Sequence, residues 1–199
     1  MNRLIIIGAS GHGRVIADIA ELNGYTDILF LDDNTAVQEC GGFRRIGTSM
    51  NAPEGDVFVA IGNAAARKRL SEHYMDRHQP TLIHPSAVIA KDVHLGPGTA
   101  VMAGAVINPG STVGRGCIIN TCSSVDHDCT ISDYVHIAVG AHLCGTVAIG
   151  ENTWVGAGAV ISNNICICKD CLIGAGAVVV KDILVSGKYL GIPATLKRE

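Results

Sequence analysis

Every sixth residue from Ile83 to Val185 is Ile, Leu or Val, and the series has no break. Four positions after each of these residues stands a mostly small one, such as Ala105, Ser111 or Ala159. The period fits neither an α-helix nor a flat strand, which repeat every ~3.6 and ~2 residues. It is typical of the hexapeptide β-helix, in which hexamers form short strands and corners of a triangular coil. We expect the aliphatic and the small residues to point inward, because so narrow a coil has room for little else.

The residues before the repeat show a different pattern, in which short apolar runs alternate with amphipathic stretches. Strands are predicted at Leu4–Ile7, Ile28–Leu31 and Val57–Ile61, and helices at Arg14–Leu22 and from Asn63 to about His78. This order is the opening of a Rossmann-like unit. The sequence therefore predicts an α/β domain plus an all-β domain, with a small Rossmann-like domain at 1–80 and a β-helix of hexapeptide repeats at 81–199.

A glycine-rich turn, Gly8–Gly13, joins the first predicted strand to the first helix. Its backbone N–H groups and the helix N-terminus can bind a phosphate. The spacing is G-x-x-G-x-G rather than the dinucleotide spacing G-x-G-x-x-G, and one small domain lacks the two halves that hold a dinucleotide. A single nucleotide with a pyrophosphate fits better. We expect Gly11, His12 and Gly13 to contact it, while His12 has the alternative of being an ordinary loop residue.

Polar pairs follow the second and third predicted strands. Asp32 and Asp33 end the second strand, and Gly62 and Asn63 end the third. Asp32, Asp33, Gly62 and Asn63 are predicted to belong to the nucleotide-sugar site. Asp32 and Asp33 are suited to hydrogen-bond a base or a ribose. The alternative for the two carboxylates is a solvated turn.

Within the repeat, Asp126, His127 and Asp128 fill one corner between the inward residues Val125 and Cys129. A histidine flanked by two carboxylates has its neutral tautomer fixed and its basicity raised. The pattern predicts His127 as a general base oriented by Asp128, with Asp126 adding negative charge. The alternative is an exposed histidine in an acidic turn.

Glycines recur at positions that stack in neighbouring coils. Gly145 follows His127 by one coil, so it is predicted to leave space for a ligand beside the imidazole. Gly156-Ala157-Gly158 and Gly174-Ala175-Gly176 also stack, and they predict a smooth wall for a long, thin ligand.

Metal and disulfide chemistry are not indicated. His136 and His142 share an outward phase but fall on successive faces of the triangle, so they form no evident metal pair. Of the clustered cysteines, Cys171 is predicted to point inward as a compact hydrophobe, while Cys166 and Cys168 point outward. We therefore expect no metal site.

The charge and hydropathy of the chain exclude other classes of function. The net charge is −3 and no run of Lys or Arg occurs, which disfavours nucleic-acid binding. The longest apolar stretches are too short to span a bilayer, and Leu4–Ile7 leads into the glycine turn without a signal-peptide cleavage site. We expect a cytoplasmic protein with no membrane or nucleic-acid partner.

Together these motifs resemble the hexapeptide-repeat acetyltransferases of the sialic acid O-acetyltransferase (NeuD-like) family, and most of all the PglD-like UDP-4-amino-sugar N-acetyltransferases. The matching motifs are Gly8–Gly13, Phe30–Asp33, Ala60–Asn63, Asn120-Thr121, Val125–Cys129, His136, Gly140–His142 and Gly191–Ala194. Thr195 stands where the family has a lysine, so we do not predict a cofactor contact from this residue.

The resemblance implies a left-handed solenoid, a homotrimer, and acetyl-CoA lying between neighbouring solenoids. In that groove Gly145, Gly156, Ala157, Gly174 and Ala175 would contact the cofactor, with His136 as a hydrogen-bond partner. The resemblance also implies N-acetylation of a nucleotide-linked amino sugar, a UDP-4-amino-4,6-dideoxy sugar, in surface glycan or glycoprotein biosynthesis.

Three other functions remain open at this point. In O-acetylation of sialic acid or a related sugar, His127 would activate a hydroxyl group instead of an amine. A γ-carbonic-anhydrase-like metalloenzyme needs three converging histidines, whereas the phases of His127, His136 and His142 diverge. An inactive scaffold would not bind acetyl-CoA.

Overall fold

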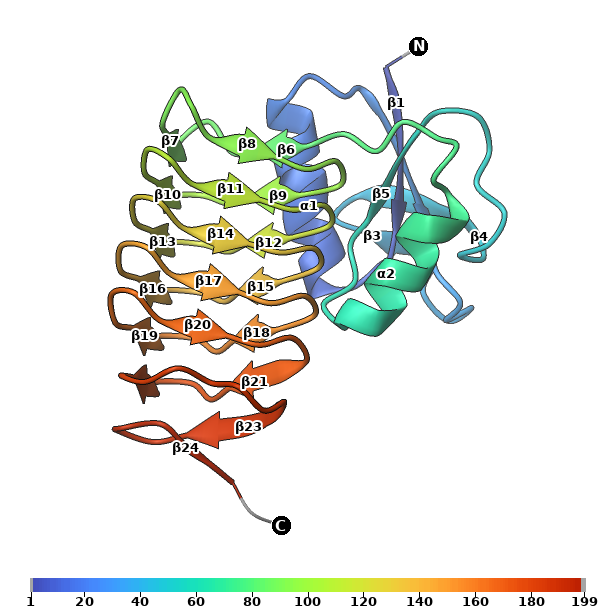
Figure 1. Ribbon diagram of the computed structural model, residues 1–199. Coiled ribbons are helices and arrows are strands. Elements are labelled where there is room, and N and C mark those ends of the chain that lie inside the picture. Colours follow the sequence, from blue (N-terminus) through green and yellow to red (C-terminus); the bar gives the residue numbers. More distant parts are fainter. Residues whose placement is uncertain (1, 198–199) are drawn as a thin grey trace.

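The computed structural model describes residues 2–197 and shows two parts lying side by side, a small α/β domain and a three-sided solenoid (Figure 1). The sheet of the α/β domain has the order β3-β4-β2-β1-β5 and is parallel except for the β3–β4 hairpin. Its strands are β1 (Arg3–Ile7), β2 (Asp27–Leu31), β3 (Glu39–Cys40), β4 (Phe43–Gly47) and β5 (Asp56–Val59), and its helices are α1 (Gly11–Leu22) and α2 (Ala64–His73).

The two helices cover opposite faces of this sheet. Leu4 and Ile6 of β1 pack in one cluster with α1, whereas Ile5 and Ile7 pack in a second cluster with α2. All four side chains are fully buried, because the strand is covered on both faces. The α1 cluster also contains Ala100 and other residues of the solenoid, so α1 is sandwiched between the sheet and the solenoid (Figure 1).

The solenoid has three faces of short, parallel strands. Face 1 contains β6 (Leu82–Ile83), β9 (Ala100–Val101), β12 (Ile118–Ile119), β15 (His136–Ile137), β18 (Trp154–Val155), β21 (Cys171–Ile173), β23 (Gly187–Leu190) and β24 (Thr195–Leu196), of which β24 alone is antiparallel to its neighbour. Face 2 contains β7 (Val88–Ile89), β10 (Val106–Ile107), β13 (Ser124–Val125), β16 (His142–Leu143), β19 (Val160–Ile161) and β22 (Val178–Val179). Face 3 contains β8 (His94–Leu95), β11 (Thr112–Val113), β14 (Thr130–Ile131), β17 (Ala148–Ile149) and β20 (Cys166–Ile167).

The interior of the solenoid has the predicted composition. Aliphatic residues such as Val125 and Ile137 alternate with small ones such as Ala141 and Ala159, and all of these are buried in one cluster. An α/β domain followed by a parallel β-helix is the predicted fold class, which is confirmed.

The last coil departs from the prediction. Val185 was expected inside, but it is 62% exposed. The chain shortens this coil, because Ile183 pairs with Ile167 of β20 and β23 already begins at Gly187. Val185 therefore lies in a bend rather than in a strand.

The α/β domain differs from the prediction at its element boundaries. Helix α1 begins at Gly11, inside the glycine turn, and α2 ends at His73 rather than near His78. The α2 helix ends there because the following residue, Tyr74, packs into the core and its hydroxyl donates to the Ser49 carbonyl at 2.9 Å. The β3–β4 hairpin was not predicted.

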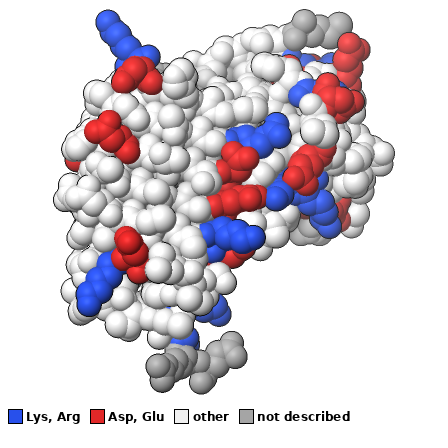
Figure 2. Space-filling model, in the orientation of Figure 1, with Lys and Arg blue, Asp and Glu red and all other residues white. Residues whose placement is uncertain are grey.

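Charged side chains of both signs are interspersed near the junction of the two parts (Figure 2). One ion pair crosses this junction, from Lys68 Nζ of α2 to Glu151 Oε1 of the solenoid at 2.6 Å. Within residues 2–197, neither helix has the length and apolarity that a membrane-spanning segment needs.

Candidate active site

The predicted catalytic corner lies between β13 of face 2 and β14 of face 3. His127 Nδ1 is 2.8 Å from Asp128 Oδ2. Because an ionised carboxylate can only accept, Nδ1 carries the proton and Nε2 keeps a free lone pair. Asp128 has a φ of 58°, a left-handed corner conformation that Asp tolerates better than most residues. The geometry is that of an oriented imidazole base.

The electrostatics of this corner favour a basic imidazole. The pKa of His127 is raised, first by its hydrogen bond to Asp128 and further by the charges of Asp126 and Asp128. Asp126 itself accepts hydrogen bonds from Asn108 Nδ2 at 2.7 Å and from the backbone N–H of His127 at 2.9 Å. Both bonds lower the pKa of the Asp126 carboxyl, so this residue holds its negative charge beside the histidine.

Gly145 stacks against the imidazole, as its spacing predicted. A β-carbon at Gly145 would overlap Nε2 and Cε1 of His127. The imidazole itself fills the space beside Gly145 that was predicted for a ligand, and only glycine leaves the His127 ring in its place.

His136 lies elsewhere, on β15 of face 1. Its Nε2 is 3.1 Å from Asn120 Nδ2, whose amide is oriented because Asn120 Oδ1 accepts the backbone N–H of Thr121. Nε2 of His136 is thus an acceptor and Nδ1 carries the proton. Nδ1 is buried and has no hydrogen-bond partner within residues 2–197, so it is a donor without an acceptor. Burial, with smaller contributions from Arg67 and His12, lowers the pKa of His136 to about 3.

Two adjoining hollows meet at His136 and Trp154, whose rings are stacked 5.1 Å apart. One hollow runs to Gly62 and Asn63 of the α/β domain. The other is almost entirely apolar and is lined by the predicted glycine wall, namely Gly156, Ala157, Gly174 and Ala175. The structure thus brings Gly62 and Asn63, which follow β5, into one cleft with His136 and the glycine wall. His127 lies at a different corner.

The glycine turn of the α/β domain is tightly packed. A β-carbon at Gly13 would overlap the carbonyl oxygen of Gly8, whereas Gly11 faces open space. His12 is half-buried, and its buried Nε2 has no hydrogen-bond partner among the described residues. Burial, together with the charge of Arg67, lowers the pKa of His12 to about 4, so the imidazole is neutral at physiological pH.

Asp32 and Asp33, which follow β2, accept hydrogen bonds from residues of the same domain. Asp32 Oδ2 accepts the backbone N–H of Ala9 in the glycine turn at 2.7 Å. Asp33 accepts the backbone N–H and the hydroxyl of Ser49, and these bonds lower the pKa of its carboxyl. Asp32 therefore ties the glycine turn to β2, and Asp33 ties β2 to the loop that follows β4.

Arg67 of α2 was missed by the sequence reasoning. It is 2% exposed, and its guanidinium donates to carbonyl oxygens of both parts of the molecule. The acceptors are Ile61 and Gly62 of the α/β domain and Gly116 and Tyr134 of the solenoid, at 2.6–2.8 Å. Arg67 therefore holds the segment that follows β5 beside His136. No sequence signal distinguishes it from the neighbouring Lys68 and Arg69.

Within residues 2–197 no group of three His, Cys, Asp or Glu side chains is placed to hold a metal ion. Cys171 is buried and Cys166 is exposed, as predicted. Cys168 was predicted to point outward, but it is half-buried, because it packs against the solenoid core with its Sγ 3.5 Å from that of Cys171.

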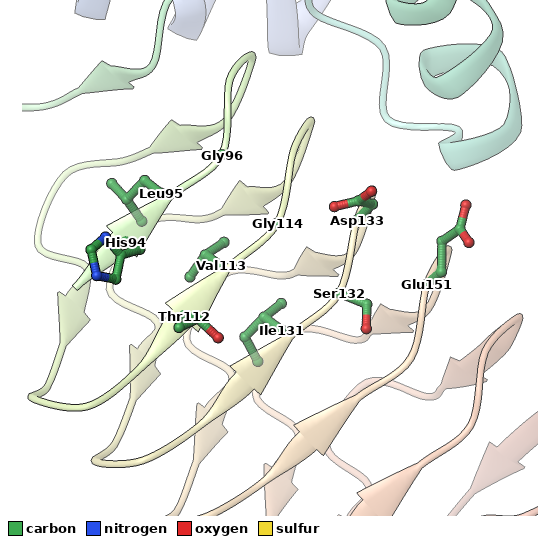
Figure 3. Close-up of a pocket in the computed structure, with 10 residues that line it drawn as sticks. All are labelled: His94, Leu95, Gly96, Thr112, Val113, Gly114, Ile131, Ser132, Asp133 and Glu151. Atoms are coloured by element: carbon green, nitrogen blue, oxygen red, sulfur yellow. The ribbon is translucent and has the colours of Figure 1, made fainter.

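A separate groove with both polar and apolar lining follows face 3 (Figure 3). It runs from His94 over Thr112 to Asp133 and Glu151. None of the predicted site residues lines it.

Comparisons with known proteins match both parts of the chain. Residues 3–74 match the PglD N-terminal domain, and residues 146–181 match the bacterial transferase hexapeptide model. UDP-N-acetylbacillosamine N-acetyltransferase of Bacillus subtilis is 36% identical over 113 residues, which is 52% of this chain and about half the length of that relative (52%).

Solved structures match over almost the whole chain. The acetyltransferase domain of PglB from Neisseria gonorrhoeae is 39% identical, with a TM-score of 0.95 over 99% of this chain and 100% of that one, and it has also been solved with acetyl coenzyme A. PerB from Caulobacter crescentus, in complex with CoA and GDP-perosamine, is 35% identical, with a TM-score of 0.92 over 98% of this chain and 97% of that one.

These relatives are acetyl-CoA-dependent N-acetyltransferases of nucleotide-linked amino sugars, which confirms the predicted class of enzyme. The chain belongs to the PglD-like family of hexapeptide-repeat sugar N-acetyltransferases.

Proposed function

We propose that this protein transfers the acetyl group of acetyl-CoA to the amino group of a nucleotide-linked amino sugar, a UDP-4-amino-4,6-dideoxy sugar, with His127 as the general base. The observation that carries the base assignment is the 2.8 Å contact between His127 Nδ1 and Asp128 Oδ2. It leaves the Nε2 lone pair for the substrate. The complexes of the relatives with acetyl coenzyme A and with GDP-perosamine support the two substrates.

The reaction needs one proton transfer in each direction. The sugar amine attacks the thioester carbonyl and forms the C–N bond, while His127 Nε2 accepts a proton from the nitrogen. The tetrahedral intermediate then breaks the C–S bond, and His127 returns the proton to the leaving sulfur. A backbone N–H at Gly145, which lies against the imidazole, is suited to stabilise the oxyanion. The products are the acetamido sugar and CoA.

The assay that tests this function measures acetyl-CoA consumption with UDP-, GDP- and dTDP-linked amino sugars and with sialic acid. We expect turnover with an amino sugar and none with the hydroxyl acceptor. Turnover of sialic acid alone would replace N-acetylation by O-acetylation.

The pH dependence of the reaction follows from the raised pKa of His127. The base must be neutral, so kcat/KM falls with decreasing pH as His127 becomes protonated, and the midpoint lies above about 6.5, the ordinary histidine pKa. Asp128→Asn removes the first cause of the raised pKa. We expect kcat to fall and the acid limb of the pH–rate profile to move to lower pH. An unchanged profile would separate Asp128 from the base.

The nucleotide is assigned to the α/β domain, at Gly11, His12 and Gly13 of the glycine turn together with the two strand ends. Asp32 holds the backbone of this turn through Ala9. Asp32→Ala should therefore raise KM for the nucleotide sugar about tenfold, the loss of one charge-assisted hydrogen bond, and leave KM for acetyl-CoA nearly unchanged. Steady-state kinetics with each substrate varied in turn decides this. A rise in both constants would contradict a nucleotide site in this domain.

The position of the site calls for a second copy of the chain. His127 projects at the corner of faces 2 and 3, whereas the glycine wall and His136 line a cleft on face 1. The outer side of face 2, between them, carries Val88, Val106, Val160 and Val178, with the polar pair Ser124 and His142 at its middle. Packing of these faces around a threefold axis would bring His127 of one chain to the cleft of the next. A homotrimer of about 62 kDa, three times 20.7 kDa, is the assembly that light scattering should detect.

A further inference from the structure

The coil that precedes the catalytic corner contacts it at every residue from Asn108 to Ser111. Asn108 Nδ2 donates to Asp126 Oδ1 at 2.7 Å. The carbonyl oxygen of Pro109 accepts the backbone N–H of Asp128 at 3.0 Å. Ser111 Oγ donates to the carbonyl oxygen of Asp126 at 2.8 Å and accepts the backbone N–H of the residue after Asp128 at 3.1 Å. Backbone and carboxylate of the corner are therefore held from one side.

Gly110 provides space rather than a bond. It has a φ of +76°, and a β-carbon built on it would overlap Asp128 Oδ1. The carboxylate that binds His127 thus lies directly over this glycine. The backbone N–H of Gly110 donates to Asp92 Oδ2 of the coil before it at 2.9 Å, which fixes the glycine in turn.

The residue types of this coil differ from those of its neighbours. At the position of Asn108 the other coils carry Ala90, Asp126, Cys144 and Ser162. At the position of Gly110 they carry Asp92, Asp128, Thr146 and Asn164. Four of these five corner positions hold a residue other than glycine, although all but the first have positive φ. The left-handed conformation alone therefore does not demand a glycine here, whereas the Asp128 carboxylate does.

We propose that Asn108 and Gly110 are positioning residues that hold the two carboxylates on either side of His127 in their working geometry. Asn108 fixes the carboxylate of Asp126 at the backbone N–H of His127, and Gly110 leaves the room in which Asp128 reaches Nδ1. The inference rests on the proposed role of His127 as the base. It extends the active site to the coil that precedes the catalytic corner.

Two effects follow if either residue is changed. The imidazole loses its fixed orientation, and a misplacement of about 1 Å costs about a hundredfold in rate. The negative charges that raise the pKa of His127 also move away from the ring. Asp126 and Asp128 are the charged groups that act on His127, and Asp92 lies one coil beyond Gly110. A merely structural defect would not shift the pH–rate profile.

The experiment compares Gly110→Ala with Gly42→Ala, using the full chain. Gly42 lies in the turn between β3 and β4 and has a φ of +84°, but a β-carbon on it meets nothing within 4 Å, so it has the same kind of backbone strain without the clash. We expect Gly110→Ala to lower kcat about a hundredfold and to move the acid limb to lower pH, with KM for acetyl-CoA unchanged. Gly42→Ala should keep the parental kcat and profile.

Asn108→Ala provides a second measurement in case Gly110→Ala fails to fold. The side chain of Asn108 is half-buried, so its truncation leaves no large cavity. We expect a fall in kcat of about tenfold or more with the same direction of shift in the pH profile. Parental kcat and profile in a folded variant of either residue would overturn the inference. A parent that turns over no amino sugar would instead overturn the proposed function.

Discussion

Replacement of His127 by Ala should lower kcat about a hundredfold or more, as expected for the loss of a general base. The physical reason is that Asp128 accepts the proton of His127 Nδ1 at 2.8 Å, which leaves the lone pair of Nε2 free and pointing away from Asp128. A neutral sugar amine can attack the thioester without the base, but it then carries its extra proton through the transition state. The variant should still bind acetyl-CoA, which calorimetry with the cofactor alone measures.

His94→Ala is the matched control for this variant. His94 is exposed like His127, and it lies on the short strand β8, in the groove of Figure 3, which none of the predicted site residues lines. It should keep the parental kcat. Activity of His127→Ala within a few-fold of the parent would remove His127 from the mechanism.

Two inactive variants should restore activity to each other when they are mixed. His127→Ala lacks the base, and Ala157→Trp fills the apolar cleft that is proposed to hold CoA. If each site joins His127 of one chain to the cleft of the next, every trimer that contains both variants has one intact site of three, so mixed trimers should regain about a third of the parental activity. Co-expression with two different affinity tags isolates the mixed trimers, whose kcat measures this fraction. This effect is large, because each variant alone is nearly inactive.

The control for this experiment is a mixture of two variants of the same element. Chains with His127→Ala and chains with Asp128→Ala both lack a working base, so their mixture should stay inactive. A site contained within one chain would show no gain in either mixture. A fully active monomer in dilute solution would likewise contradict the shared site.

The hexapeptide period by itself determined most of the solenoid. Its phase placed Val125 and Cys129 inside and Asp126, His127 and Asp128 together at a corner, because each coil repeats the same geometry. The same arithmetic placed Gly145 against the imidazole. The pairing of His127 with Asp128 was predictable because it is local in the sequence.

The last coil shows the limit of such periodicity. Val185 continues the sequence pattern but lies exposed, because the terminal coil has no further coil to stack upon and the chain instead turns into β23. In the α/β domain, likewise, the pattern located β1, β2 and β5 but not the β3–β4 hairpin, because β3 has only two residues and β4 (FRRIG) has neither an apolar run nor apolar alternation.

What the sequence alone determined is therefore the fold class, the family and the residues whose partners lie one hexamer or one coil away. The tertiary structure decided the contacts between elements of unrelated spacing. Arg67 joins α2 to two solenoid corners, and Asp33 accepts a hydrogen bond from the hydroxyl of Ser49. His12 comes close enough to His136 to lower its pKa. The physical reason is that such contacts depend on how the α/β domain packs on face 1, which no period along the chain encodes.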